Sequence, residues 1–280
     1  MIHFRQQEED QQALEATASF LNYVMKKDHF SSSYLQWQYL SNPEGKAIAI
    51  CAFVDDKVTG HYAAQPIVSK INGEDVRGLF ILNAAVDPAN QGKGLLRGIA
   101  DRLHEEAARQ GYRFMIGVGN KNSTPIYTKK FGFRLIGPLD VKIGAGIPHK
   151  DSTSGYFYEK SWSTDALNWR MMNPYSGYEI HQSKDQTVIY KKNFPFLASI
   201  MAEFNEKISL AAIKKSSPLN FHLYIGSDPA IQWKRNLRFI TFPEIAKPSP
   251  LNLIFREVQG ELIPVTKENM LFRCIDFDAF

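Results

Sequence analysis

The sequence predicts an α/β protein, in which a twisted mixed β-sheet flanked by helices is followed by a second, smaller α+β domain. Residues 79–86 are almost entirely apolar, which is typical of a strand buried on both faces in the middle of a sheet. Residues 95–107 carry apolar side chains at intervals of four, which predicts a long amphipathic helix. Strand, helix and extended patterns then alternate to residue 141, and this alternation indicates one α/β unit.

The residues before this unit predict a helix and a pair of antiparallel strands. A helix is expected over residues 7–26, where apolar side chains recur at helical spacing. The apolar run 48–54 predicts a strand that ends at Asp55-Asp56, and residues 58–68 would pair with it. Asn72-Gly73 then predicts a type I′ turn, because both residue types tolerate positive φ.

The buried strand and the amphipathic helix have clear ends in the sequence. Strand 79–86 stops at Asp87-Pro88, because proline cannot continue a β ladder. Gly111 is the expected stop of the helix. The elements that follow are a strand over 112–118, a short helix over 123–131 and an extended segment over 133–141.

Composition excludes several classes of protein. A chain of 280 residues with 44% hydrophobic and 22% charged residues fits one large or two ordinary soluble domains. A net charge of +4, shared by both halves, argues against a nucleic-acid partner. The apolar runs are far shorter than a membrane span, and the first ten residues do not resemble a signal peptide. Cys51 and Cys274 cannot form a disulfide framework or a Cys-rich zinc site, so we expect a reduced, cytoplasmic protein without a membrane partner.

Two short stretches of the sequence are echoed later in the chain. Residues 35–37 with Asn42-Pro43 resemble residues 167–169 with Asn173-Pro174. Residues 133–136 likewise resemble 237–240, each after an expected short helix with an early proline. The echoes indicate a degenerate duplication whose second copy lacks the Gly-rich stretch of the first, and an unrelated second domain is the alternative.

A domain border is expected at residues 144–154, which are rich in Gly, Ser and Pro. We therefore place one domain at 1–148 and another at 149–280. The tryptophans of the first echo, Trp37 and Trp169, are either buried anchors before a turn or rings that stack on a glycan.

A Gly-rich loop between the buried strand and the long helix predicts an anion site. Backbone N–H groups without obstructing side chains, at the positive end of a helix dipole, bind phosphates, and Lys93 and Arg97 add positive charge at the rim. A diphosphate is the expected ligand. The sequence has no Gly-Lys-[Ser/Thr], which excludes a Walker loop, and its GxGxxxG spacing differs from the dinucleotide fingerprint GxGxxG.

This loop resembles the acetyl-CoA loop of the GNAT N-acetyltransferase superfamily, which reads Q/R-x-x-G-x-G/A. Residues 91–94 match its first four positions, and Leu96 stands at the sixth, where the family has Gly or Ala. The family's preceding strand reads V-x-V and splays from its neighbour, so that free backbone groups pair with the pantetheine; Ala84-Ala85-Val86 stands there. The family's later Asn, helical Tyr and Gly-Phe correspond to Asn120, Tyr127 and Gly132-Phe133.

The resemblance covers residues 79–136 well and extends more weakly to residue 3. It implies a GNAT-like catalytic domain in residues 1–148 that uses acetyl-CoA as co-substrate, without a metal. Residues 149–280 would be a degenerate GNAT-like or accessory domain without the cofactor loop. The implied cofactor-binding residues are Ala84, Ala85, Val86, Gln91, Gly92, Lys93, Gly94, Leu95, Leu96, Asn120, Ser123 and Tyr127.

The resemblance also implies catalytic roles. Tyr127 would return a proton to the departing thiolate, since a phenol has a pKa of about 10; packing in the helix is its alternative role. A backbone N–H at the end of strand 79–86, that of Val86, would stabilise the oxyanion. The family often places a carboxylate where Asn83 stands, so the general base would be His61, Asp87 or an ordered water. The absence of HExxH and GxSxG leaves metal-dependent hydrolysis and serine esterase chemistry without support.

We therefore expect an N-acetyltransferase that moves an acetyl group to a primary amine of a small molecule or amino sugar, directly in a ternary complex. The second domain would wall off the acceptor site or mediate a homodimer. Lys129-Lys130 would either contact the 3′-phosphate of CoA or be a solvated helix face. A non-catalytic acyl-CoA sensor is the alternative, favoured by Leu96 and the missing carboxylate.

Overall fold

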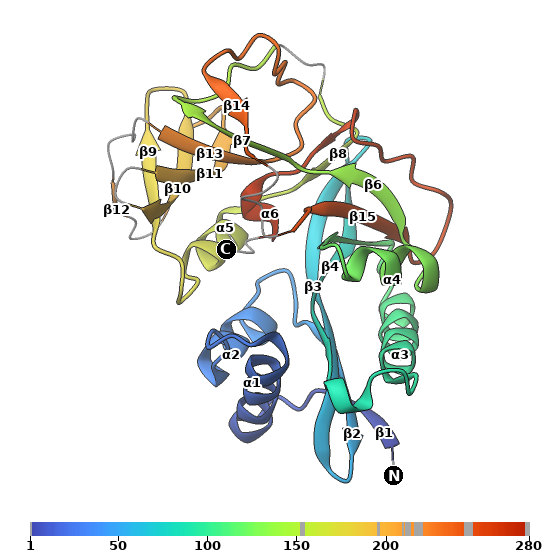
Figure 1. Cartoon of the computed structure of the whole chain (residues 1–280). Coiled ribbons are helices and arrows are strands. Elements are labelled where there is room, and N and C mark those ends of the chain that lie inside the picture. The colour runs from blue at the N-terminus through green and yellow to red at the C-terminus, as the bar shows by residue number, and fades with distance from the viewer. Residues whose placement is uncertain are drawn as a thin grey trace.

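The structure is a computed structural model that describes residues 2–151, 155–194, 197–208, 210, 214–215, 221–243 and 249–277. It contains two mixed β-sheets with helices packed around them (Figure 1). The predicted α/β class is therefore confirmed. Residues 152–154 of the expected domain border lie outside the described residues. No described helix has both the length and the hydropathy needed to cross a membrane.

The first sheet is central to the molecule, and helices cover both of its faces (Figure 1). Helices α1 (Gln11–Met25) and α2 (Ser32–Leu40) lie on one face, and α3 (Leu95–Arg109) and α4 (Ser123–Lys130) lie on the other. In spatial order its strands are β1 (Ile2–Gln6), β2 (Ile48–Val54), β3 (Lys57–Ile71), β4 (Glu74–Val86), β5 (Phe114–Gly119), β15 (Asn252–Glu257) and β6 (Arg134–Pro138). Two further strands, β8 (Tyr158–Lys160) and β16 (Met270–Leu271), extend the edge of β3.

Local sequence signals explain where these elements begin and end. Helix α1 starts later than predicted because Asp10 caps it, accepting a hydrogen bond of 2.9 Å from the Ala13 N–H. The β2–β3 turn has φ of 49° and 61° at Asp55 and Asp56, and the β3–β4 turn has φ of 52° and 84° at Asn72 and Gly73. Positive φ at both central residues is the type I′ signature, so the predicted turn at Asn72-Gly73 is confirmed.

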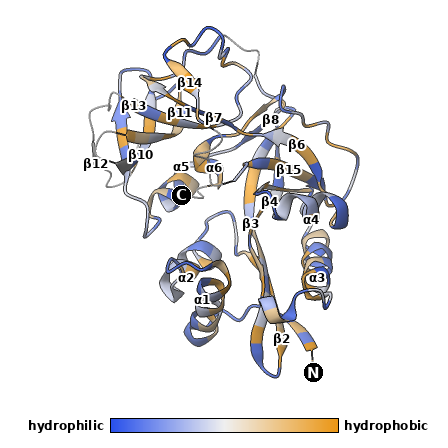
Figure 2. Ribbon diagram, viewed as in Figure 1, coloured by the Kyte–Doolittle hydropathy of each residue, from blue (hydrophilic) through white to orange (hydrophobic). Residues whose placement is uncertain are grey.

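Each face of the first sheet has its own hydrophobic core. On the α3 face, Leu95, Ile99, Leu103 and Ala107 are buried, as their spacing in the sequence predicts. On the α1 face, the core includes Leu14, Leu21 and Leu35. Figure 2 shows apolar residues along the covered strands and polar residues over the loops. The central strand β4 is therefore covered from both sides, which explains its apolar sequence.

The second sheet repeats the strand arrangement of the first. Its order is β12 (Lys214–Lys215), β9 (Tyr178–Gln182), β10 (Thr187–Phe194), β11 (Leu197–Phe204), β13 (Phe221–Gly226), β7 (Asp140–Ala145) and β14 (Phe239–Thr241). The succession β9-β10-β11-β13-β7-β14 has the same relative strand directions as β2-β3-β4-β5-β15-β6. Helices α5 (Thr164–Met171) and α6 (Cys274–Phe277) lie between the second sheet and the first (Figure 1).

The two sheets exchange one strand each. Strand β7 leaves the first sheet and pairs between β13 and β14, while β15 returns from the second half and pairs between β5 and β6. The extended structure predicted over 133–141 is confirmed, but it divides into two strands, because Gly137, with φ of 151°, and Pro138 end β6 before β7 begins. Each exchanged strand lies on one side of the expected division between 148 and 149 and pairs with strands from the other side. The position of this division stays a prediction.

Trp37 and Trp169 join the two halves through a near-symmetric contact. Their rings stack at 4.9 Å, and the indole N–H of each donates to the backbone carbonyl of the other, at 2.9 and 3.0 Å. Both are buried anchors, because 8% and 7% exposure leaves no ring face for a glycan. The helices that carry them begin with matching caps at Ser31 and Ser163. The expected short helix near Pro229 is absent, since residues 229–236 form turns.

Candidate active site

The site is built where β4 and β5 separate. These parallel strands pair only from Gly78↔Phe114 to Phe80↔Ile116, whereas β4 runs on to Val86 and β5 to Gly119. On its other side β4 remains paired with β3 as far as Val86. The backbone of β4 beyond Phe80 therefore faces an opening in the sheet, where a ligand can take the place of a strand.

A β-bulge reshapes β4 within this opening. The pairing passes from Ala63↔Leu82 to His61↔Ala85, so Asn83 and Ala84 stand together opposite Tyr62. Asn83 has φ of 52°, a left-handed conformation that Asn adopts more readily than most residues. The bulge turns the backbone of β4 at the point where the two strands part.

A closed ring of hydrogen bonds holds the bulge. The Asn83 amide donates to the Tyr39 hydroxyl at 2.7 Å, and His61 Nδ1 donates to the Asn83 carbonyl at 2.9 Å. The Tyr39 hydroxyl lies 3.5 Å from His61 Nε2, which completes the ring. Complete burial lowers the pKa of His61 to about 4, so the imidazole is neutral and can donate from one nitrogen while accepting at the other.

This buried neutral histidine should make the protein acid-sensitive. Because the folded pKa of His61 lies below the ordinary value of 6.5, its stabilising effect is complete above pH 6.5 and is lost as pH falls toward 4. We expect wild type to lose about 2 kcal/mol more stability than His61→Gln between pH 7 and pH 5. Urea unfolding followed by circular dichroism measures this difference. Equal losses in the two proteins would show that another group controls the acid response.

A cavity of about 670 Å³ lies beside the opening, between β4, α3 and α4. Of the residues that the sequence assigns to cofactor binding, it is lined by Ala84, Ala85, Val86, Gln91, Gly92, Gly94, Leu95 and Leu96. Gly92 and Gly94 have φ of 79° and 78°, so their backbone turns depend on glycine. Gly94 is the N-cap of α3, and no side chain caps the helix and no acidic residue stands in its first turn. The first N–H groups of α3 are thus available to an anion.

Positive side chains flank this cavity, but hydrogen bonds within the protein hold two of them. The Lys93 ammonium donates to Asn90 at 3.0 Å, and Lys93 does not line the cavity. Arg97 does line it, while its guanidinium is paired with Asp101 at 2.8 Å and donates to the Lys130 carbonyl at 2.9 Å. The loop is therefore braced in one shape before any ligand arrives.

Asn120 and Ser123 shape the start of α4 and do not line the cavity. The Asn120 carboxamide oxygen accepts from the Asn122 and Ser123 N–H groups at 2.9 and 2.8 Å. The Ser123 hydroxyl in turn accepts from the Asn120 N–H at 2.9 Å. This reciprocal turn fixes α4 against β5, so both residues act on a ligand only through the position of α4.

Tyr127 lies inside the core rather than at the cavity surface. Its ring is 7% exposed and packs edge-on against Phe131 and Phe133, and it lies 6.1 Å from the ring of Tyr62, opposite the bulge. Burial raises the pKa of Tyr127 well above 10, so its hydroxyl keeps its proton at neutral pH. Tyr127 does not line this cavity, and its role as proton donor stays a prediction.

The cavity also has walls that the sequence analysis did not assign to the cofactor, apart from Lys130, for which a contact with the 3′-phosphate of CoA was one of two alternatives. Ile126 and Lys130 project from α4 one turn apart, next to Asn122 and Phe131, and Val24 closes the cavity from the end of α1. Ile126 and Lys130 are four residues apart, and this helical spacing could have predicted that they lie on the same face of α4. Nothing in the sequence indicates that Val24, sixty residues before Ala84, would reach this cavity.

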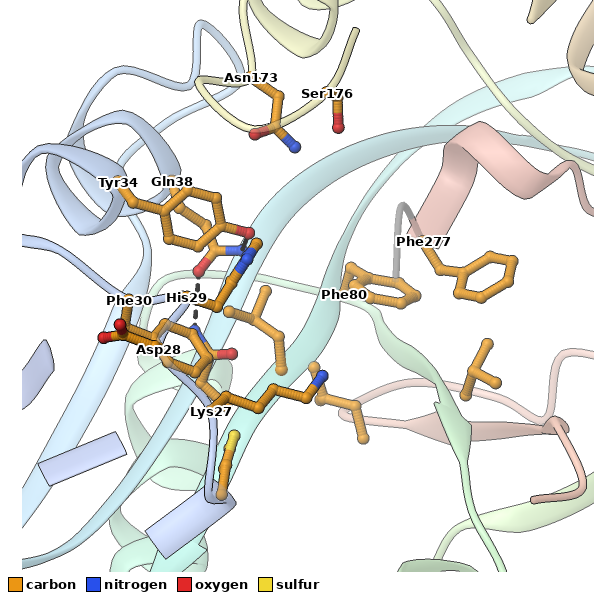
Figure 3. Close-up of a pocket in the computed structure, with 15 residues that line it drawn as sticks. Lys27, Asp28, His29, Phe30, Tyr34, Gln38, Phe80, Asn173, Ser176 and Phe277 are labelled. Atoms are coloured by element: carbon orange, nitrogen blue, oxygen red, sulfur yellow. Dashed lines mark hydrogen bonds between the residues drawn. The ribbon is translucent and has the colours of Figure 1, made fainter. Parts of the chain in front are cut away.

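A second cavity, of about 620 Å³, adjoins the first along β4. Residues 80–83 of β4 line it, directly before the residues 84–86 that line the cofactor cavity. Figure 3 shows Lys27, His29 and Tyr34 on one side of it and Phe80 and Phe277 on the other. Asn173, Ser176 and Phe277 come from the second half of the chain, so this half supplies part of the wall.

Comparisons with known proteins agree with this geometry. Residues 4–136 match the model of the acetyltransferase (GNAT) domain family. A probable N-acyltransferase of unknown function from Enterococcus faecalis V583 has a similar structure, with a TM-score of 0.65 and 11% identity over 92% of this chain and 73% of that one. A GCN5-related N-acetyltransferase from Anabaena variabilis ATCC 29413 has a TM-score of 0.62 and 14% identity, over 92% of this chain and 73% of that one. A GCN5-related N-acetyltransferase from Kribbella flavida has a TM-score of 0.62 and 10% identity, over 92% of this chain and 71% of that one. No curated protein matches this chain.

Proposed function

We propose that this chain, a GNAT acyltransferase through residues 4–136, moves an acetyl group from acetyl-CoA to a primary amine of a small molecule in one ternary complex. The observation that carries the proposal is the meeting of two cavities along β4, at the place where β4 leaves β5. GNAT enzymes generally use acetyl-CoA. A donor held in one cavity and an acceptor held in the other would meet at the bulge without a covalent enzyme intermediate.

The residues of the cofactor cavity fit acetyl-CoA. The uncapped N–H groups at the start of α3 would hold the diphosphate, and the glycines before them leave room for close approach. The backbone of residues 84–86, open on the side of β5, would pair with the pantetheine amides. Lys130, which lines the cavity, is the candidate partner of a phosphate. Bound there, the thioester supplies an activated acetyl group beside the second cavity.

His61 would position the site rather than remove a proton itself. One of its ring nitrogens donates to Asn83, and the other faces Tyr39, so neither points into a cavity. We assign deprotonation of the amine to water in the second cavity, which residues 80–83 of β4 line. The role of His61 would be to keep the backbone of β4 in the bulged shape that places the carbonyl of the thioester.

The test is a thermal shift with acetyl-CoA and CoA, followed by thiol release on a panel of amines. If Tyr127 donates the proton, Tyr127→Phe should lower kcat about 10- to 100-fold and leave acetyl-CoA affinity unchanged. Tyr112→Phe is the control, because Tyr112 is another buried tyrosine of the same core. Equal turnover in wild type and both variants would remove Tyr127 from the chemistry.

A non-catalytic acyl-CoA sensor is the second candidate. It is favoured by one specific observation, that Asn83 rather than a carboxylate stands at the bulge, with its amide committed to Gln38 and Tyr39 at 2.7 Å each. A sensor would show the thermal shift with acetyl-CoA but release no thiol with any amine. Thiol release with any amine would show that the protein is an acetyltransferase and not a sensor.

A further inference from the structure

We infer that the acceptor of this enzyme is an amine that carries a planar aromatic body and an anionic group. The inference rests on the proposed function and names the substrate class of the second cavity, called here the acceptor cavity and defined by Lys27, His29, Tyr34, Phe80, Asn83 and Phe277. Three features of this cavity support it: two aromatic walls, one unpaired cation, and a floor whose polar groups already have partners.

Aromatic rings face each other across the acceptor cavity. On one side the rings of His29 and Tyr34 contact edge-on at 4.7 Å, and both contact Tyr175 at the rim, at 4.7 and 5.2 Å. On the other side lie Phe80 and Phe277 (Figure 3). A flat aromatic group between such walls gains both apolar burial and ring stacking, which an aliphatic chain cannot match.

Lys27 supplies a positive charge to the acceptor cavity. Its side chain runs into the acceptor cavity (Figure 3), and no described side chain or backbone group forms a hydrogen bond or ion pair with its ammonium group. Asp28 is the only carboxylate that the described lining contains. The described part of the lining therefore lacks the cluster of acidic groups that would attract a polyamine, whereas an anionic substituent could form an ion pair with Lys27.

The floor of the acceptor cavity offers little to a hydroxyl-rich sugar. The Asn83 amide donates to both Gln38 and Tyr39 at 2.7 Å, so its two protons are used. The Gln38 amide donates to the Tyr34 hydroxyl at 3.2 Å. A bound amino sugar would bury hydroxyl groups against partners that are already occupied, and this costs affinity.

The experiment compares four primary amines at saturating acetyl-CoA, with thiol release as the readout. 4-(Aminomethyl)benzoate has both the ring and the carboxylate, benzylamine has only the ring, 6-aminohexanoate has only the carboxylate, and glucosamine has neither. We expect kcat/KM for 4-(aminomethyl)benzoate to exceed that of each other amine about tenfold or more. A higher kcat/KM for glucosamine, or for spermidine added as a fifth amine, would overturn the inference while leaving the proposed function standing.

Two variants assign the effect to the named residues. Lys27→Met should erase the advantage of 4-(aminomethyl)benzoate over benzylamine, and Lys26→Met, a neighbouring exposed lysine outside the cavity lining, should preserve it. Phe80→Ala should raise KM for the two aryl amines but not for 6-aminohexanoate. The same amines are also added to the acetyl-CoA complex in a thermal shift. If acetyl-CoA stabilises the protein but no aryl amine binds the complex or releases thiol, the inference is wrong; if acetyl-CoA itself gives no shift, the proposed function is wrong.

Discussion

Replacing Gly92 by Asp should abolish acetyl-CoA binding while leaving the fold intact. Gly92 lines the cofactor cavity with φ of 79° and has no atom within 4 Å of the place where a Cβ would stand. The new carboxylate would therefore fit sterically, but it would oppose the diphosphate at the mouth of α3. Like charges brought together in a binding site cost several kcal/mol, so we expect at least a 100-fold rise in Kd by titration calorimetry.

Gly73→Asp is the matched control for this variant. Gly73 has φ of 84° and is equally free of atoms within 4 Å, but it lies in the β3–β4 turn, away from the cofactor cavity. Both variants carry the same left-handed strain, about 1 kcal/mol, and the same new charge. Only Gly92→Asp should lose binding. Normal acetyl-CoA affinity in Gly92→Asp would show that the diphosphate does not lie on this loop.

The elements that sequence predicts best are those fixed by local chemistry. Strand β2 has the predicted bounds 48–54, because an apolar run ended by two turn-forming aspartates leaves little choice. Helix α3 starts at Leu95, as predicted, because Gly94 can adopt the left-handed cap. The strand exchange could not be predicted, because β7 and β15 do not pair with the strands next to them in the sequence, and no local pattern identifies their partners. The partners are fixed by contacts between residues more than seventy positions apart in the sequence.

The candidate site, too, has one part that local sequence predicts and another part that depends on distant segments. Residues 84–86 and residues 91, 92 and 94–96 of the loop line one cavity, because a strand, a glycine turn and a helix N-terminus are joined directly along the chain. The acceptor cavity is lined from the end of α1 and the residues after it, α2, β4, the residues after α5, and α6, and no local pattern joins these segments. Tyr127 shows the limit of a motif. Its place along the chain matches the family's tyrosine, but its ring packs in the core and the neighbouring Ile126 lines the cavity instead.

The second sheet has the same strand arrangement as the first, but the point where its parallel strands part is closed by side chains. Strands β11 and β13 also separate, after Ile200↔Tyr224, but the cavity there measures only about 20 Å³. Lys150 fills the opening and pairs with Glu203 at 2.8 Å and with Asp228 at 3.2 Å. If the second half is a duplicated unit that lost its cofactor loop, its strands would still be needed, because β13 and β14 pair with the exchanged strand β7 of the first half. This explains how the second half can be retained for shape and for the wall of the acceptor cavity.

Removing one partner of the buried Lys160–Glu44 pair should strongly destabilise the protein. Lys160 is 3% exposed, its ammonium lies 2.8 Å from the Glu44 carboxylate, and it stands over the Trp162 ring at 4.2 Å. The pair ties β8 to the loop before β2, across the two halves of the chain. Lys160→Met would leave Glu44 buried without a counter-charge, and we expect a loss of about 3–5 kcal/mol in the free energy of unfolding by urea denaturation.

A double variant and an exposed pair separate charge from packing. Lys160→Met with Glu44→Gln should recover part of the loss, because the uncompensated carboxylate is gone. Lys46→Met, which breaks the surface pair with Glu9, should cost less than about 1 kcal/mol, since both side chains are more than half exposed. If Lys160→Met costs no more than Lys46→Met, the buried pair does not hold the halves together. A double variant as unstable as Lys160→Met would instead place the loss in the packing of the lysine stem over Trp162.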